Sequence, residues 1–337
     1  MDNIGFINEF KSVINKEGAK RIFFVSSREY DRFGYRLALE ELGCEVYSFT
    51  AFEPCPEVSS VTEGVNQLMK FNPDIIAAVG GGSAIDCAKG IKYYLDKDIK
   101  ILAVPTTAGS GAEVTRTSVL YNNADKQSVK DISLIPEYAV FDYTTLLTLP
   151  GFQKISTALD AFCHSFEAFI SKNSTEESRG YSLASLRIFA DSFDRYVSGD
   201  ESTFEDMMKC SELAGRAINI AQTAAPHAFS YKLHKLKGLA HGQACAVSLV
   251  YIWKYMNEFA DEGTKKMLSF LEKECRLTAD GLEAKLKALG VLPEIIMTND
   301  EFYETVNGVN IERIANNPMK FNLDDIEKIY SSFIKVE

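Results

Sequence analysis

Short apolar runs alternate with amphipathic segments along the first 150 residues. The apolar runs suit strands that are buried on both faces of a sheet, and they cover 21–26, 44–49, 74–79, 100–104 and 138–141. Between them, apolar residues recur at helical spacing over 30–42 and 58–71. This alternation predicts an α/β domain with a mainly parallel, Rossmann-like sheet. Ligand sites in such sheets collect at the carboxyl ends of the strands.

The pattern changes after Pro150, where helical spacing dominates. Helices are expected over 156–170, 177–196, 205–223 and in the tail from residue 311. No repeat, low-complexity tract or long linker interrupts the sequence. Two tightly packed domains are therefore predicted, an α/β domain over 1–150 and an all-helical domain over 151–337.

Charge and composition narrow the classes of partner. The 337 residues are 46% hydrophobic, enough to bury the cores of two domains, and carry a net charge of -11. Because nucleic acids and anionic membranes repel such a chain, neither is an expected partner. The N-terminal residues do not resemble a signal peptide and no run reaches about 18 apolar residues, so a cytoplasmic protein is expected. The seven scattered cysteines are expected to be reduced.

Two loops rich in glycine and hydroxyl groups follow predicted strands. The first, Gly80-Gly81-Gly82-Ser83, precedes a predicted helix whose free amides and dipole favour phosphate. The second, 105–115, places hydroxyls where they can donate to phosphate or ribose. Each loop alone is also compatible with an ordinary turn. Two such loops at one edge of a sheet favour a nucleotide-binding cleft.

The four histidines give the strongest chemical signal. Asp160 and His164 are four residues apart, so a helix presents them on one face. His227, His234 and His241 are spaced by seven, close to two helical turns, and Gly238 is expected to end their helix before His241. Each histidine alone could be an ordinary core or surface residue. An aspartate and several imidazoles that converge would suit zinc or ferrous iron.

These segments resemble the signatures of the iron-containing (group III) alcohol dehydrogenases, and the similarity extends over most of the chain. The segments that match these signatures are the two loops at 80–89 and 105–115, followed by 160–168 and 227–246. The resemblance implies a dehydroquinate synthase-like architecture, a nicotinamide cofactor (NADP or NAD), and one divalent metal, Fe²⁺ or Zn²⁺. It also implies a homodimer. The implied metal ligands are Asp160, His164, His227 and His241.

The resemblance also assigns the cofactor site. It implies that Gly81, Gly82 and Ser83 hold the pyrophosphate. It implies that further residues line the cofactor channel, namely Asp86, Thr106, Thr107, Ser110, Thr115, Lys126 and Leu146. At the end of the first strand, where many members carry an acidic residue, this chain has Ser27 followed by Arg28. A hydroxyl and a guanidinium tolerate a 2'-phosphate, so a preference for NADP(H), or none, is expected.

The chain departs from the family pattern where substrate chemistry is expected. Four residues after His227, many members have a histidine suspected of proton transfer, but this chain has Tyr231. Tyr231 and His234 are therefore the candidate proton donors. The short chain resembles the phosphonoacetaldehyde reductases of this family, which implies a small anionic aldehyde. The basic run 231–237 lies between two implied ligands, and His234 shares the stripe of His227, so His234 is expected to hold the anionic group, with Arg116 as an alternative.

Three other functions remain open at this point. A lactaldehyde or propanediol type of dehydrogenase would act on uncharged substrates. A cyclising lyase of the dehydroquinate synthase type has a similar fold, a nicotinamide cofactor and a metal, but it returns its hydride. A catalytically silent cofactor- or metal-binding protein would retain the ligands without turnover.

Overall fold

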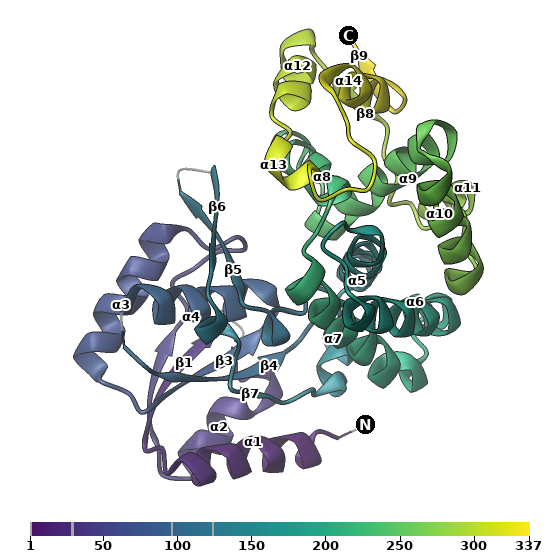
Figure 1. The fold of residues 1–337 in the computed structure, drawn as a ribbon. Helices are drawn as coiled ribbons and strands as arrows, with labels where there is room; N and C mark the ends of the chain where they lie inside the picture. Colours follow the sequence, from purple (N-terminus) through teal and green to yellow (C-terminus); the bar gives the residue numbers. More distant parts are fainter. Residues whose placement is uncertain (1, 28–29, 96, 123–124) are drawn as a thin grey trace. The chain divides into compact units, whose positions relative to one another are not determined.

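The computed structural model describes residues 2–27, 30–95, 97–122 and 125–337. These residues form two compact units, 1–149 and 150–337 (Figure 1). The division falls within one residue of the boundary expected from the sequence. None of the helices in the described part of the chain combines the length and apolar content needed to cross a lipid bilayer.

The first unit contains a five-stranded sheet in which every pair of neighbours is parallel, in the order β2-β1-β3-β4-β7. All five strands lie where the apolar runs predict them, and their bounds are β1 Arg21–Ser26, β2 Glu45–Phe49, β3 Ile75–Gly80, β4 Lys100–Pro105 and β7 Tyr138–Ala139. The α-helices of this unit are α1 Ile4–Glu17, α2 Tyr35–Glu41, α3 Val58–Phe71 and α4 Gly82–Leu95. Short 3-10 helices occur at η1 Tyr30–Phe33, η2 Ala112–Val114, η3 Ile132–Leu134 and η4 Tyr143–Thr148.

Helices cover both faces of this sheet (Figure 1). Alternate residues of one strand point to opposite faces, so Phe24 packs with α1 and α2 while Phe23 packs with α3 and α4. Both side chains are fully buried. Burial on both faces explains why the strands read as continuous apolar runs.

The helix expected over 30–42 is interrupted. Gly34 has a φ of +74°, a left-handed conformation that glycine adopts without steric cost, and it separates η1 from α2. An antiparallel hairpin, β5 Thr117–Asn122 with β6 Asp125–Lys130, was also not predicted. Its entry is fixed by the buried Lys89, whose ammonium donates to the carbonyls of Thr115 and Thr117 at 2.6 and 3.1 Å.

The second unit is rich in helices, as expected. They are α5 Gly151–Ile170, α6 Glu176–Val197, α7 Phe204–Ala221, α8 Ala225–Lys237, α9 His241–Phe259, α10 Glu262–Cys275, α11 Ala279–Ala288, α12 Asn299–Asn307, α13 Ile311–Ile314 and α14 Leu323–Ser331, with the 3-10 helix η5 Glu201–Thr203. Gly238 ends α8 with a φ of +68°, as the sequence predicts.

The expectation that this unit is entirely helical is wrong. Two three-residue strands, β8 Ile295–Met297 and β9 Ile334–Val336, pair in parallel. The tail from residue 311 is correspondingly broken into α13, α14 and β9 rather than forming one helical stretch. Strands this short leave no periodic signal, because three residues do not establish an alternation.

Helix α9 begins in close contact with α5, and this contact depends on Gly242. A Cβ atom at this position would lie 1.9 Å from the carbonyl oxygen of Ser156 and 2.9 Å from Cβ of Asp160. Only a residue without a side chain lets the two backbones approach so closely. The same contact is closed by the amide of Gln243, which donates to Oγ of Ser156 at 3.3 Å.

We expect Gly242→Ala to lower the free energy of unfolding by about 1–3 kcal/mol, because the added methyl group overpacks the contact. Gly180→Ala is the matched control, since Gly180 lies inside α6 and a Cβ there meets no atom of the described residues within 4 Å. That control should be neutral or stabilising by up to ~1 kcal/mol. Denaturant unfolding measures both, and equal stability of Gly242→Ala and the wild type would contradict the packing described.

Candidate functional site

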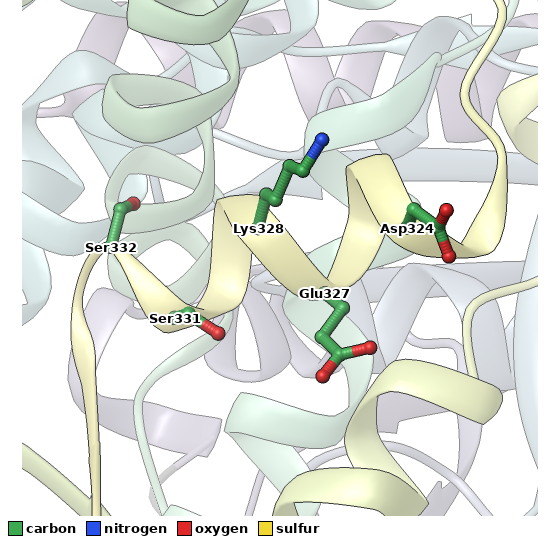
Figure 2. A pocket seen from close by; sticks show the side chains of 5 residues that line it. All are labelled: Asp324, Glu327, Lys328, Ser331 and Ser332. Carbon is green, nitrogen blue, oxygen red and sulfur yellow. The ribbon is translucent and has the colours of Figure 1, made fainter.

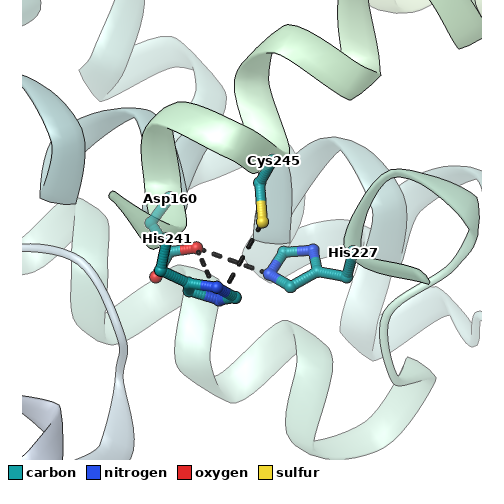
Figure 3. Close-up of side chains that lie close together, drawn as sticks. All are labelled: Asp160, His227, His241 and Cys245. Atoms are coloured by element: carbon teal, nitrogen blue, oxygen red, sulfur yellow. Dashed lines mark hydrogen bonds and ion pairs between the residues drawn. The ribbon is translucent and has the colours of Figure 1, made fainter. Parts of the chain in front are cut away.

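Four side chains from three helices of the second unit converge on one point (Figure 3). Asp160 belongs to α5, His227 to α8, and His241 and Cys245 to α9. One ligand atom from each residue lies within 4.8 Å of every other. Asp160 and His227 are 6% and 5% exposed, whereas the His241 side chain is 43% exposed. The cluster is therefore buried on one side and accessible beside His241.

A single carboxylate oxygen lies at the centre of the imidazoles. Oδ1 of Asp160 is 3.4 Å from Nε2 of His227, 3.7 Å from Nε2 of His241 and 3.8 Å from Nε2 of His164. Among the described residues, neither this oxygen nor Nε2 of His227 makes a hydrogen bond, although both are buried. Separations of this size between Oδ1 and the three nitrogens are typical of atoms that bind one metal ion. Buried polar atoms usually have hydrogen-bond partners, so the lack of such partners for Oδ1 and Nε2 of His227 also indicates a bound ion.

The sequence-predicted ligands thus come together, with one difference in detail. His164 lies beside the cluster, and its ring stacks on that of His227 with centroids 4.6 Å apart. It does not belong to the set whose ligand atoms are all mutually within 4.8 Å, and Cys245 does. In the sequence, Cys245 is one of seven scattered cysteines that are expected to be reduced, and nothing there sets it apart.

Glu167 is a buried residue of this site that the sequence analysis missed. Its carboxylate accepts a hydrogen bond from Nδ1 of His227 and another, at 2.6 Å, from the amide of Ala224 just before α8. Because the Glu167 carboxylate accepts this hydrogen bond, Nδ1 carries a proton and Nε2 faces Asp160. Glu167 could have been found from its spacing, because it is seven residues, or two turns, after Asp160 on α5.

The charges of the cluster influence each other strongly. Burial alone would raise the pKa of Asp160, but attraction to the imidazoles of His164, His241 and His227 outweighs it and holds this pKa well below its usual range. Burial likewise opposes a charge on His227, yet Cys245, Glu167 and Asp160 raise its pKa well above its ordinary value. The cluster therefore favours positive charge on His227 next to the Asp160 carboxylate.

The two candidate proton donors lie on α8, after His227. His234 is held in place because Nδ1 donates to the carbonyl of Leu239 at 2.6 Å. Its ring centroid is 6.4 Å from that of His241, which places it beside the accessible edge of the cluster. Tyr231 is one turn after His227 and is partly buried.

Two lysines of the basic run on α8 are already paired. Lys232 binds Glu304 at 2.6 Å and Lys237 binds Glu301 at 2.7 Å, both carboxylates belonging to α12. These pairs indicate that the two lysines line a solvated face of α8 and do not hold substrate. Arg116 lies in the first unit, next to the hairpin.

The two loops that the sequence predicts for the cofactor lie in contact with each other at the carboxyl ends of β3 and β4. A Cβ atom at Gly82 would lie 2.8 Å from Oγ of Ser110, and one at Gly81 would lie 3.2 Å from Thr107. The glycines therefore permit the loops to pack closely, and Ser83 and Asp86 follow them in the first two turns of α4. Helix α4 begins at Gly82, so its N-terminal amides lie at this edge.

The remaining residues predicted for the cofactor site differ in solvent accessibility. Ser27 directly follows β1 and is exposed, and Thr106 is partly exposed. The Thr115 hydroxyl is instead turned inward, where it accepts from the Lys89 ammonium at 3.1 Å, and Leu146 is fully buried in η4. The Lys126 side chain and Arg28 lie outside the described residues.

A separate hollow occurs on the surface of α14 (Figure 2). Polar side chains of this one helix and the residue after it line the hollow, namely Asp324, Glu327, Lys328, Ser331 and Ser332. It includes none of the predicted site residues. Without convergent groups from other elements, it has no feature of a catalytic site.

Several known proteins are similar to this chain over most of its length. The chain is 27% identical to the NADPH-dependent butanol dehydrogenase of Clostridium saccharobutylicum, over 94% of this chain and 92% of that protein. It is 30% identical to the 1,3-propanediol dehydrogenase of Citrobacter freundii, over 87% and 84%. The solved sulfoacetaldehyde reductase of Bifidobacterium kashiwanohense, in complex with NAD+, matches with a TM-score of 0.88 and 25% identity, over 98% of this chain and 95% of that chain.

Family models cover nearly the whole chain. Residues 3–143 match iron-containing alcohol dehydrogenase, and residues 154–334 match the C-terminal part of the Fe-containing alcohol dehydrogenase family. The two matches follow the two compact units and include both cofactor loops and the donor cluster. The chain belongs to the iron-containing alcohol dehydrogenase family.

Proposed function

We propose that this chain reduces a small aldehyde to an alcohol with NAD(P)H, using a divalent metal held by Asp160, His164, His227 and His241. The observation that carries the proposal is the convergence of three imidazole nitrogens within 3.8 Å of one buried oxygen of Asp160. This oxygen and nitrogen donor set fits ferrous iron or zinc. When bound, the metal supplies Lewis acidity, which polarises the aldehyde carbonyl toward hydride.

The residues of the chain position the reaction. Glu167 keeps Nδ1 of His227 protonated, so that Nε2 offers its lone pair to the centre. The glycine loop at 80–82 and the N-terminus of α4 are suited to the pyrophosphate of the cofactor. When bound, the cofactor would supply the hydride for the carbonyl carbon, and a donor of this chain would supply the one proton that the oxygen needs to become the alcohol.

A proton donor is required near the exposed side of the cluster. His234 is suitable because its Nδ1 is the proton-bearing nitrogen toward Leu239, which makes Nε2 the nitrogen that exchanges protons with its surroundings. Tyr231 is the second candidate, since it occupies the next turn of α8 after His227. Both candidates would deliver the proton directly or through water.

One observation supports the hypothesis that the substrate is an anionic aldehyde, and another weakens it. The sulfoacetaldehyde reductase acts on an aldehyde that carries an acidic group, and it matches this chain at 25% identity. The lysines of α8 offer less support, because Lys232 and Lys237 are paired with carboxylates. We therefore place the anionic group of the substrate, with phosphonoacetaldehyde as the leading example, near His234.

The metal assignment predicts a graded response to two substitutions. His241→Ala removes a ligand and should abolish both stoichiometric iron or zinc and steady aldehyde-dependent oxidation of NAD(P)H. Glu167→Gln retains every ligand and changes only the partner of His227, so metal affinity should fall by about 10- to 100-fold. Metal analysis and cofactor absorbance measure both effects. Full metal content and turnover in His241→Ala would refute the site, and a wild type that does not consume cofactor steadily would favour the cyclising lyase.

A preference for NADPH, or equal use of both cofactors, is expected. Ser27 is neutral and exposed after β1, so no carboxylate at this position repels a 2'-phosphate. The relatives differ, since the butanol dehydrogenase is NADPH-dependent and the sulfoacetaldehyde reductase is in complex with NAD+. Ser27→Asp should reduce kcat/KM for NADPH at least about tenfold while sparing NADH, equivalent to ~1.4 kcal/mol. A strong preference of the wild type for NADH would contradict the expectation.

The substrate hypothesis predicts that kcat/KM for phosphonoacetaldehyde exceeds that for uncharged aldehydes of similar size by at least about tenfold, or ~1.4 kcal/mol. His234→Ala should remove most of this difference, because an imidazolium can pair with the anionic group. Lys232→Ala is the control on the same helix, since that ammonium is bound to Glu304. Equal or better use of lactaldehyde by the wild type, unchanged in His234→Ala, would show that the substrate is uncharged.

A further inference from the structure

The turn between α7 and α8 contains a residue in a strained backbone conformation. Gln222, the C-cap of α7, has a φ of +63° and a ψ of 169°, a combination that is adopted almost only by glycine. Asn72 and Arg276 also cap helices with a positive φ, but their ψ values of 66° and 36° belong to the left-handed helical region that helix ends commonly use. The Gln222 side chain is exposed, so its burial does not account for the conformation. Such strain persists only where surrounding contacts hold the backbone in place.

The side chain of Asn316 holds this turn on both sides of Gln222. Its Nδ2 donates to the carbonyls of Ala221 and Thr223, the residues directly before and after Gln222, at 2.9 and 3.0 Å. A side-chain amide nitrogen carries two protons, so one group satisfies both carbonyls. The two hydrogen bonds therefore fix the peptide groups that flank the strained residue.

Asn316 is itself attached to the end of α5. Its Oδ1 accepts from the hydroxyl of Ser171 at 2.7 Å and from the amide of Asn173 at 3.2 Å. Its backbone carbonyl accepts from the amide of Lys172 at 2.9 Å. These bonds also set the orientation of the side-chain amide, because Oδ1 must face a backbone N–H and Nδ2 must face the two carbonyls. A residue between α13 and α14 (Figure 1) thus joins the end of α5 to the turn before α8.

The position of His227 depends on how this turn ends. Residues 222–224 alone separate α7 from α8, and His227 belongs to the first turn of α8. The amide of Ala224 is bound at 2.6 Å by the Glu167 carboxylate, which also accepts from the ring of His227. Asn316 and Glu167 therefore hold the turn from its first peptide group to its last.

We propose that Asn316 is a positioning residue of the metal site, because it holds the strained turn at Gln222 and thereby fixes His227 beside Asp160. This inference rests on the metal site of the proposed function and names a residue outside the ligand set that determines its geometry. Nε2 of His227 lies 3.4 Å from Oδ1 of Asp160 in this arrangement. Without the two hydrogen bonds of Asn316, Gln222 relaxes toward an ordinary conformation, the first turn of α8 moves, and His227 binds the metal less well.

The zinc affinity of the full-length protein, measured by competition with a chromogenic chelator, tests the inference without relying on turnover. Asn316→Ala should bind zinc at least about tenfold more weakly than the wild type. Asn316→Ser, which also lacks the two N–H donors, takes its place if the alanine variant does not fold. Wild-type zinc affinity in the folded variant would overturn the inference, even if urea unfolds that variant more easily, because the role of Asn316 would then be structural only. A wild type that does not bind zinc would refute the metal site itself, and this inference with it.

A second substitution, at Gln222, separates the turn from other effects of losing Asn316. Gln222→Gly removes the strain, because glycine adopts the conformation of this residue without a Cβ penalty. Combined with Asn316→Ala, it should restore most of the lost zinc affinity. Gln222→Ala is the matched control, since it removes the same exposed side chain but retains the Cβ atom, and it should restore none. Equal zinc affinities of the two double variants would overturn the proposed link between the strained turn and His227.

Discussion

The close approach of α9 to α5 at Gly242 is the constraint on which the donor cluster depends. It brings His241, the first residue of α9, to within 3.7 Å of Asp160, which lies more than 80 positions earlier in the chain. Glu167 fixes the third helix, because one carboxylate binds both the amide before α8 and the ring of His227. The contact at Gly242 and the hydrogen bonds of Glu167 therefore determine where the donors from three helices lie. Both interactions involve residues of α5.

The buried charges of the cluster are compatible with folding only if they compensate one another. Burying a carboxylate is costly unless positive charge or hydrogen bonds stabilise it. Glu167 obtains its hydrogen bonds from His227 and from the amide just before α8, whereas Oδ1 of Asp160 obtains none from the described residues. A divalent cation would supply that missing stabilisation, so metal binding and the stability of this helical unit should be linked.

Much of this arrangement could be predicted from the sequence because it is local. The strands of the first unit are buried on both faces and appear as apolar runs, and the i,i+4 spacing of Asp160 and His164 marks one helix face. The short strands β8 and β9 left no pattern. Cys245 could not be distinguished from other buried thiols, since its proximity to Asp160 arises from the packing of α9 on α5. Likewise, the ion pairs of Lys232 and Lys237 with α12 are contacts between distant segments that a basic run does not reveal. The homodimer stays a prediction.

The central claim is that one divalent metal is bound at Asp160 and the surrounding imidazoles. Anomalous diffraction from crystals of the metal-loaded protein, recorded on both sides of the absorption edge of the metal, locates that ion without reference to activity. The account predicts one strong peak within bonding distance, ~2.0–2.2 Å, of Oδ1 of Asp160 and of Nε2 of His227 and His241. A peak elsewhere in the molecule, or none in protein that carries one equivalent of metal, would contradict it.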